Sequence, residues 1–312
     1  MAEVTAVIVS MDRPDLLYPC LNSILACNSC KVDIFVVAYM FSQGNLDALQ
    51  RDYPSVRVIV NDSLSGFSEN NNLALKLVES EFVFIVNDDT IQKEPVIDKL
   101  LADIKGLPES VAAVSPKIVF ADGSVQTCGR PPLTVWLWMK HYLHIEEDEN
   151  KAGKWNQESG LFRTYTLNGA CFLARTSAFR QAGWLDETYT FTPEDIALGH
   201  KFNEMGLQVY ADADVSIVHL ANSTASAIEA AIKPTRIRGS LIFLSRGSKL
   251  RYFLLGSYAC AIECARYAKY MILGCRTERD RVMKATAANV LASVFSGKST
   301  KEIFTHYYGT IR

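Results

Sequence analysis

Short, largely apolar runs of strand length alternate with amphipathic segments of helix length through the first half of the chain. Such runs are typical of strands buried on both faces of a parallel sheet. They cover residues 4–9, 32–37, 56–60, 82–86 and 111–114. Pro14 suits a helix start, and an apolar stripe at helical spacing follows it. This alternation predicts an α/β fold with a mostly parallel central sheet.

The second half of the chain is less regular. Residues 130–165 contain three tryptophans and many charges, which favours a long loop or insertion. Beyond it the pattern predicts elements in the order strand, helix, two short strands and a helical tail. Their ranges are 167–174, 193–205, 208–210, 215–220 and 225 onward.

Charge divides the 312 residues into an acidic body and a basic tail. Residues 1–220 hold 17 Lys and Arg against 29 Asp and Glu, and the remainder holds 15 against 5, so the two parts carry −12 and +10. The tail suits an anionic partner surface, and a membrane is favoured over nucleic acid because no nucleic-acid motif is present. Segregation of charge between sheet and helices is the alternative. A tail that packs on the catalytic domain or forms a homo-oligomer interface is another.

One tail segment, 252–273, is long enough to span a bilayer. Glu263, Arg266 and Lys269 make insertion costly, at about 2.5–3.5 kcal/mol each. Because these charges fall on one helical face, we expect an amphipathic helix that lies on a membrane or covers a core.

The first residues show no secretory signal, so the eight cysteines favour reduced thiols and a cytoplasmic protein. Cys27 and Cys30 form one CxxC without a second pair, which disfavours zinc. His141 and His144, beside Glu146 and Glu147, fit a solvated loop better than a metal site.

The strongest chemical signal is Asn87-Asp88-Asp89-Thr90, directly after the fourth apolar run. Ligands of open parallel sheets bind at the carboxyl ends of the strands. Two carboxylates there suit Mg²⁺ or Mn²⁺. An Asp-rich turn that caps the next helix is the alternative.

Three further segments carry candidate chemistry. Glu194-Asp195 opens a helix after Pro193, which suits either helix capping or a general base at Asp195. His219 ends an apolar strand, as a structural residue or a ligand of the same ion. Gly66 precedes three consecutive asparagines, which require capping or ligand contacts because Asn is a poor helix former. No phosphate-binding glycine motif is present, which disfavours dehydrogenases and P-loop enzymes.

Taken in order, these motifs resemble the family 2 glycosyltransferases, and within them the rhamnosyltransferase-like branch. The resemblance covers roughly residues 4–250. Its segments are VIVS at 7–10, RPDLL at 13–17, Asn61 to Phe67 with Asn71 and Asn72, NDDT at 87–90, VSPK at 114–117, DGSVQ at 122–126, NGACFL at 168–173, GWLDE at 183–187, ED at 194–195, and His219 with Ser223 or Ser226.

The resemblance implies a GT-A fold and inverting transfer of a sugar. The expected catalytic domain is 1–224, with a nucleotide-sugar half at 1–115 and an acceptor half at 116–224, followed by a helical region at 225–312. The donor would be a UDP- or dTDP-sugar, with rhamnose among the candidates. The acceptor would be a hydroxyl of a glycan or lipid-linked saccharide in cell-surface polysaccharide synthesis, with the protein at the cytoplasmic membrane face.

The resemblance also assigns residues. Asp195 would be the catalytic base and Glu194 its support, while Asp89, Asp88 and His219 would hold Mn²⁺ or Mg²⁺. The expected nucleotide-sugar contacts are Ser10, Asp12, Arg13, Tyr39, Gly66, Asn71, Asn87, Asp88 and Gly169.

The chain departs from the family pattern at two positions. Ala38 stands where a carboxylate commonly reads the base, so Tyr39 is the candidate for stacking on the base, and Ala197 replaces a further Asp. These departures motivate an alternative, a nucleotide-sugar-binding scaffold without activity. A nucleotidyltransferase would use similar carboxylates, but the glycine-rich start that it usually has is missing. Trp136, Trp138 and Trp155 suit either an acceptor site or packing beneath a loop.

Overall fold

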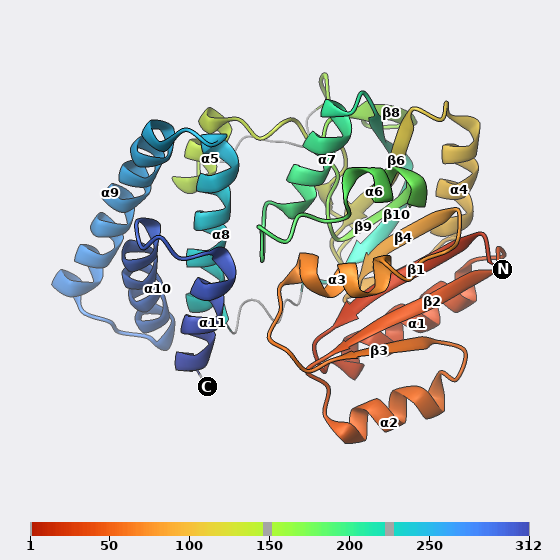
Figure 1. Ribbon diagram of the computed structural model, residues 1–312, viewed down its shortest axis with the longest axis horizontal. Coiled ribbons are helices and arrows are strands. Elements are labelled where there is room, and N and C mark those ends of the chain that lie inside the picture. The colour runs from red at the N-terminus through yellow and green to blue at the C-terminus, as the bar shows by residue number, and fades with distance from the viewer. Residues whose placement is uncertain (1, 146–151, 222–227, 312) are drawn as a thin grey trace. The chain divides into compact units, whose positions relative to one another are not determined.

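The computed structural model describes residues 2–145, 152–221 and 228–311, and divides into two compact units (Figure 1). The first unit comprises 1–132, 148–186 and 195–222, and the second comprises 133–147, 187–194 and 223–312. The second unit thus takes two segments from within the range expected for the catalytic domain.

The first unit is built on one sheet that begins with four parallel strands (Figure 1). Their order is β3-β2-β1-β4, with β1 (Val4–Ser10), β2 (Val32–Tyr39), β3 (Arg57–Asn61) and β4 (Phe82–Asn87). The sheet continues through β9 (Cys171–Arg175), β6 (Val111–Val119), β10 (Gln208–His219) and β5 (Thr90–Ile91), while β7 (Val125–Thr127) pairs with β6 and β8 (Leu161–Thr164) pairs with β10. The predicted α/β fold is confirmed.

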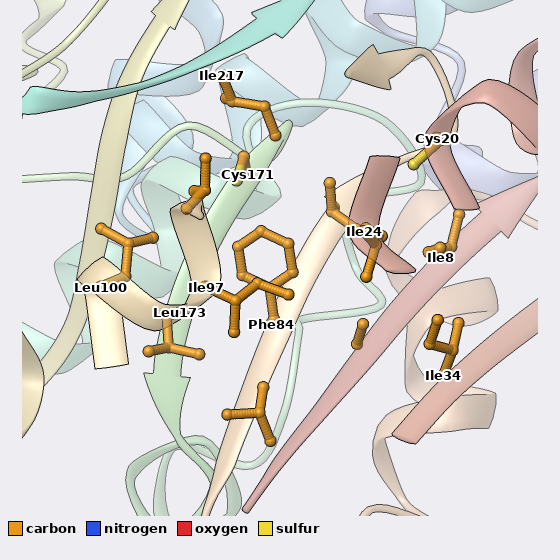
Figure 2. Close-up of a cluster of buried hydrophobic side chains, with 14 of the residues drawn as sticks. Ile8, Cys20, Ile24, Ile34, Phe84, Ile97, Leu100, Cys171, Leu173 and Ile217 are labelled. Carbon is orange, nitrogen blue, oxygen red and sulfur yellow. The ribbon is translucent and has the colours of Figure 1, made fainter. Parts of the chain in front are cut away.

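Helices cover both faces of this sheet because alternate strand residues point to opposite sides. On one face, Ile8 and Phe84 pack against α1 (Pro14–Cys27), α2 (Gln43–Asp52) and α4 (Val96–Gly106). Figure 2 shows side chains of this cluster around Phe84. On the other face, Val7 and Ile85 pack against α3 (Phe67–Leu75), α6 (Thr176–Ala182) and α7 (Glu194–Glu204). Burial on both faces explains why the strands lack polar alternation.

Several predicted boundaries were wrong in the second half of the chain. The strand expected at 167–174 begins at Cys171 and runs antiparallel to both neighbours. The two short strands expected over 208–220 form one strand, β10, with a register shift between Asp212 and Ser216. The expected loop over 130–165 contains β8 and a helix, α5 (Val135–Tyr142).

The second unit is helical, as the tail pattern predicts. It consists of α5, α8 (Glu229–Ser245), α9 (Lys249–Leu273), α10 (Glu278–Val294) and α11 (Thr300–Ile311). Trp138 of α5, Leu241 of α8, Leu255 of α9 and Val290 of α10 are buried together in its core. Within the described residues, no helix combines the length and the hydropathy that a membrane span requires.

α9 covers the core of this unit and buries only one of the three charges that the sequence places on one face, since Glu263 is buried and Lys269 is exposed. Glu263 is fully buried and accepts hydrogen bonds from Tyr142 Oη at 2.8 Å and from Arg266 at 2.6 Å. By contrast, Leu254 and Ile272 expose 58% and 82% of their surface. These partners hold one carboxylate oxygen, Oε1, inside the unit, so the opposite, apolar side of α9 faces outward.

Two carboxyl groups of the first unit lie close together beneath α4. Asp103 of α4 neighbours Asp212 of β10, and burial together with the Asp212 carboxyl raises the pKa of Asp103 to about 7. The ordinary pKa of an Asp carboxyl is about 3.9. Between about pH 4 and about pH 7, Asp103 is therefore protonated in the folded state and ionised in the unfolded state. The stabilisation is therefore complete below about pH 4 and is lost as pH rises through 7.

We expect Asp103→Asn to raise the free energy of unfolding at pH 8 and to change it much less at pH 5. Asparagine keeps a neutral hydrogen-bonding group at a site where the charged form is disfavoured. Urea unfolding of wild type and variant at both pH values measures the effect. Glu109→Gln, at an exposed position of the same unit, is the matched control. Equal effects of Asp103→Asn at both pH values would contradict the raised pKa of Asp103.

Candidate active site

The carboxyl end of β4 carries the acidic pair and is closed by an antiparallel bridge. Asn87 ends β4, and after Asp88 and Asp89 the chain enters β5, which pairs with the last two residues of β10, Val218 and His219. Leu220 N also donates to the Asp89 carbonyl at 2.9 Å. This pairing brings together residues that are 130 positions apart in the chain.

As a result, the His219 ring lies against the Asp89 carboxylate. His219 Nε2 is 3.1 Å from Asp89 Oδ1, and both side chains are largely buried. His219 Nδ1 is 2.8 Å from Gln126 Oε1. Because that oxygen is an acceptor, Nδ1 donates to it, and Nε2 faces the carboxylate with a lone pair unless it also carries a proton. Two facing acceptors require a proton or a cation between them.

The geometry of this pair fits a divalent cation. Two neighbouring ligands of an octahedral ion at about 2.1 Å are separated by about 3.0 Å, close to the observed 3.1 Å. The contact between His219 and Gln126 is the kind of second hydrogen bond that orients a metal-binding imidazole. In the described residues, however, no group of three His, Cys, Asp or Glu side chains is gathered closely enough to hold an ion. Asp89 and His219 thus form a two-residue set, and Asp88 does not complete it.

Asp88 lies beside the end of β1. Burial raises the pKa of its carboxyl to about 7, Ser10 and Arg13 lower it, and the charge of Asp89 raises it. Arg13 itself forms a two-bond ion pair with Asp15, at 2.7 and 2.8 Å. Ser10 and Arg13 therefore lie near enough to Asp88 to lower the pKa of its carboxyl.

The Asp195 carboxylate is held by a second set of contacts. Its Oδ2 accepts from Arg130 at 2.8 Å and from Gly169 N at 3.1 Å, and its Oδ1 accepts from Ile196 N at 2.7 Å. Arg130 also donates to the Leu167 carbonyl at 2.9 Å, which fixes the guanidinium. Glu194 opens α7 and is buried.

Sequence reasoning missed Arg130. It precedes two prolines in a stretch interpreted as a loop, and no local pattern relates it to a carboxylate 65 residues later. Only the pairing of residues 130 and 166 places its side chain beside α7.

The segment 168–170 connects the two carboxylate sites. Gly169 N donates to Asp195, and the next carbonyl, of Ala170, accepts from Asn87 N at 2.9 Å. Asn168 stabilises this turn because its Oδ1 accepts from Ala170 N at 2.9 Å. One short segment thus joins the end of β4 to the first turn of α7.

Four other candidate nucleotide contacts have partners within the fold. Asp12 accepts from Asn45 at 2.8 Å, and Asn71 donates to the Phe67 carbonyl at 2.9 Å. Gly66 N donates to Glu69 at 3.0 Å at the start of α3. Tyr39 is only 5% exposed, and its hydroxyl accepts from Ser65 N at 3.2 Å. The buried Tyr39 ring presents no open face on which a base could stack in this conformation, which corrects that expectation.

The asparagine run is explained by contacts with the backbone. Asn72 exchanges two hydrogen bonds with Leu185, at 2.9 and 3.1 Å, and Asn70 donates to the Gly66 carbonyl at 2.9 Å. These amides satisfy buried backbone groups, which offsets the poor helix propensity of asparagine. Ala38 is likewise explained, since it is fully buried in the sheet core.

The remaining predictions concern isolated residues. Cys27 donates to the Gln92 carbonyl, and burial raises the pKa of Cys30 to about 12, which suits inert thiols. Trp138 packs in the helical core, Trp155 packs against Tyr165, and Trp136 is 65% exposed. Glu146, Glu147, Ser223 and Ser226 lie outside the described residues.

Comparison with known sequences gives a family for most of the chain. Residues 2–237 match the model of glycosyltransferase like family 2. The O-antigen biosynthesis protein RfbC of Myxococcus xanthus is 26% identical over 231 residues, covering 70% of this chain and 17% of that protein. The N-acetylglucosaminyl-diphospho-decaprenol L-rhamnosyltransferase of Mycobacterium tuberculosis is 28% identical over 240 residues, covering 66% of this chain and 74% of that protein.

Comparison with solved structures gives the fold. The structure of GalNAc-T7 with UDP, GalNAc and Mn²⁺ matches with a TM-score of 0.56 at 11% identity, over 72% of this chain and 44% of that chain. The mannosyltransferase PcManGT of Pyrobaculum calidifontis, in complex with GDP-Man and Mn²⁺, matches with a TM-score of 0.53 at 14% identity, over 99% of this chain and 80% of that chain. With its GT-A fold and a family match over three quarters of its length, the chain belongs to the family 2 glycosyltransferases.

Proposed function

We propose that the chain is an inverting, divalent-metal-dependent glycosyltransferase. It would move a sugar from a nucleotide diphosphate to a hydroxyl of a glycan or lipid-linked acceptor. The observation that carries this proposal is the 168–170 segment, which ties the Asp195 carboxylate to the strand end that bears Asp88 and Asp89. A base and a cation-binding site connected by one short segment suit a single displacement at a sugar carbon.

In this mechanism Asp195 accepts the proton of the acceptor hydroxyl as its oxygen bonds to the anomeric carbon. The bond from that carbon to the diphosphate breaks, and the nucleoside diphosphate leaves with the electron pair. Arg130, Gly169 and Ile196 keep the carboxylate oriented, and beyond these three contacts Oδ1 retains one lone pair that can take the proton. A divalent ion held by Asp89 and His219 would neutralise charge on the leaving diphosphate.

The relatives suggest the chemistry of donor and acceptor. The mycobacterial relative is named as a rhamnosyltransferase that acts on a diphospho-decaprenol acceptor. We therefore favour a UDP- or dTDP-sugar, with rhamnose among the candidates, and a lipid-linked saccharide of cell-surface polysaccharide synthesis.

The outward face of α9 supports a peripheral contact with an anionic membrane. At about 100° per residue, five of its exposed apolar residues fall on one side of the helix, and Lys249, Arg251 and Lys269 flank that side. These apolar residues are Leu250, Phe253, Leu254, Met271 and Ile272. Each basic residue near an anionic surface contributes about 1 kcal/mol. An apolar stripe with basic flanks is typical of helices that lie in the membrane interface.

We expect Asp195→Asn to lower the turnover number by about 10² to 10⁴, because asparagine cannot take the proton. Binding of the Mn²⁺–nucleotide should stay within about twofold, since the base does not hold the diphosphate. Single-turnover sugar transfer and calorimetric nucleotide binding measure the two effects. Asp33→Asn, at an exposed position of the same unit, is the control. Wild-type turnover in Asp195→Asn would show that Asp195 is not the catalytic base.

We expect a nucleotide to raise the melting temperature only when Mn²⁺, Asp89 and His219 are all present. A ligand at a hundredfold excess over its Kd stabilises the folded state by about 2.7 kcal/mol. A thermal-shift screen with UDP, dTDP, GDP and CMP, with and without Mn²⁺, compares wild type, Asp89→Asn and His219→Gln. A shift that persists in both variants would contradict the metal site. No rise in melting temperature with any nucleotide would contradict both the metal site and the nucleotide-sugar-binding scaffold.

We expect replacement of Leu250, Leu254 and Ile272 by serine to abolish sedimentation with phosphatidylglycerol-containing vesicles. The change removes apolar area that would otherwise insert into the interface. Leu25→Ser replaces an exposed leucine of α1 and is the control. Sedimentation equilibrium of the same proteins tests the competing interpretation. A dimer that the triple variant converts to a monomer, with vesicle binding unchanged, would show that the face is an oligomer interface.

A further inference from the structure

The helical unit contains a cavity of its own, separate from the candidate active site. Its volume is about 360 Å³, within the range of small-molecule pockets. α5 contributes Trp138 and Tyr142 to its walls, α8 contributes Lys233 and Arg236, and α9 contributes Arg266. All five belong to the second unit, whereas Asp89 and Asp195 belong to the first. No role derived above uses this cavity.

The cationic wall is organised by Glu263. This fully buried carboxylate accepts from Arg266 at 2.6 Å and lies 3.2 Å from Lys233 Nζ. Tyr142 donates to the same oxygen, Oε1. One carboxylate thus fixes two cations, which leaves a net positive charge on this wall. Removing Glu263 would leave Lys233 and Arg266 without their shared carboxylate, and removing Lys233 would take one partner from a buried carboxylate, so neither is a clean test of binding.

Arg236 is the cation that points to a ligand. Its nearest carboxylate, that of Glu229, is 3.9 Å away, beyond hydrogen-bond distance. Its Nε is buried and makes no hydrogen bond to any residue that the structure describes. Such a guanidinium offers planar donors that match a phosphate group in geometry and charge.

Aromatic side chains also line the cavity, beside His141 and His144. Trp138 and Tyr142 are buried with their rings 5.2 Å apart, next to the basic side chains. On α5 and directly after it, Trp136, Leu143 and Ile145 expose 65%, 47% and 52% of their surface. Exposed apolar groups beside a cationic pocket suit a ligand that carries a charged head on an apolar chain.

We propose that this cavity binds a phosphate or diphosphate group carried by an apolar chain, with Arg236 as its principal ligand. Lys233 and Arg266 add positive charge, and the aromatic and apolar residues of α5 contact the chain next to the phosphate. The choice of a lipid-borne ligand rests on the proposed function, because a lipid-linked acceptor presents this group. The site would hold the phosphate end of the acceptor lipid.

The first test is calorimetric binding of inorganic pyrophosphate to the full chain at fixed ionic strength. A chelator is present, so that the Asp89 and His219 pair holds no metal. We expect Arg236→Gln to weaken binding about tenfold or more, since charge-assisted hydrogen bonds are lost. Arg236→Lys keeps the charge but loses the two-bond geometry, so its affinity for pyrophosphate should lie between those of wild type and Arg236→Gln. Arg279→Gln, an exposed arginine of α10, should bind as wild type.

The second test separates a lipid-borne phosphate from a soluble one. Phosphatidylcholine vesicles with and without added polyprenyl phosphate are sedimented with wild type, Arg236→Gln and Arg279→Gln. We expect the added lipid to increase binding of wild type and of Arg279→Gln, but not of Arg236→Gln. If only pyrophosphate binding depends on Arg236, the cavity takes a soluble phosphate.

Binding that is independent of Arg236 in both tests would overturn the proposal. If Arg236→Gln does not fold, comparison of Arg236→Lys with wild type shows whether binding depends on Arg236. Both readouts are independent of turnover, so failure of sugar transfer leaves them intact. If the cavity binds no phosphate, the Mn²⁺-dependent rise in melting temperature with nucleotide would be unchanged.

Discussion

The position of β9 between β4 and β6 is the constraint on which the site depends. Because β9 runs antiparallel to β4, Cys171 at its start pairs with Val86 near the end of β4. The turn that precedes β9 is therefore held at the edge where the parallel strands end, as the bond from Asn87 to Ala170 shows. Had β9 been parallel, this turn would lie at the opposite edge of the sheet. Residues 168–170 could then not connect the Asp195 carboxylate to the end of β4 that bears Asp88 and Asp89.

Backbone pairing fixes the two carboxylate sites more than side-chain attraction does. Asp89 meets His219 because β5 pairs with the end of β10. Arg130 meets Asp195 because residue 130 bridges residue 166, a few positions before Gly169. Side chains anchored on paired backbone lose less conformational freedom when they are ordered, which suits a site that must be preorganised.

The helical unit follows a different rule, since its buried polar group decides which way a helix faces. Glu263 has three partners inside the unit, Tyr142, Lys233 and Arg266. Burying this carboxylate with donors costs far less than burying it alone, so the side of α9 that bears Glu263 turns inward. The same arrangement exposes the apolar side of α9 and forms the cationic wall of the cavity. One buried carboxylate thus underlies both surfaces that we propose for lipid contact.

The sequence by itself determined the α/β class, the four parallel strands, the helical tail and the order of the acidic motifs. These features rest on local apolar periodicity and on residue types, which neighbours along the chain already carry. Only the tertiary structure decided that β9 is antiparallel, that Arg130 holds Asp195, that Tyr39 is buried and that Glu263 of α9 points inward. Each depends on which distant segments pair, and local periodicity carries no information on pairing between residues 130 and 166 or between residues 142 and 263.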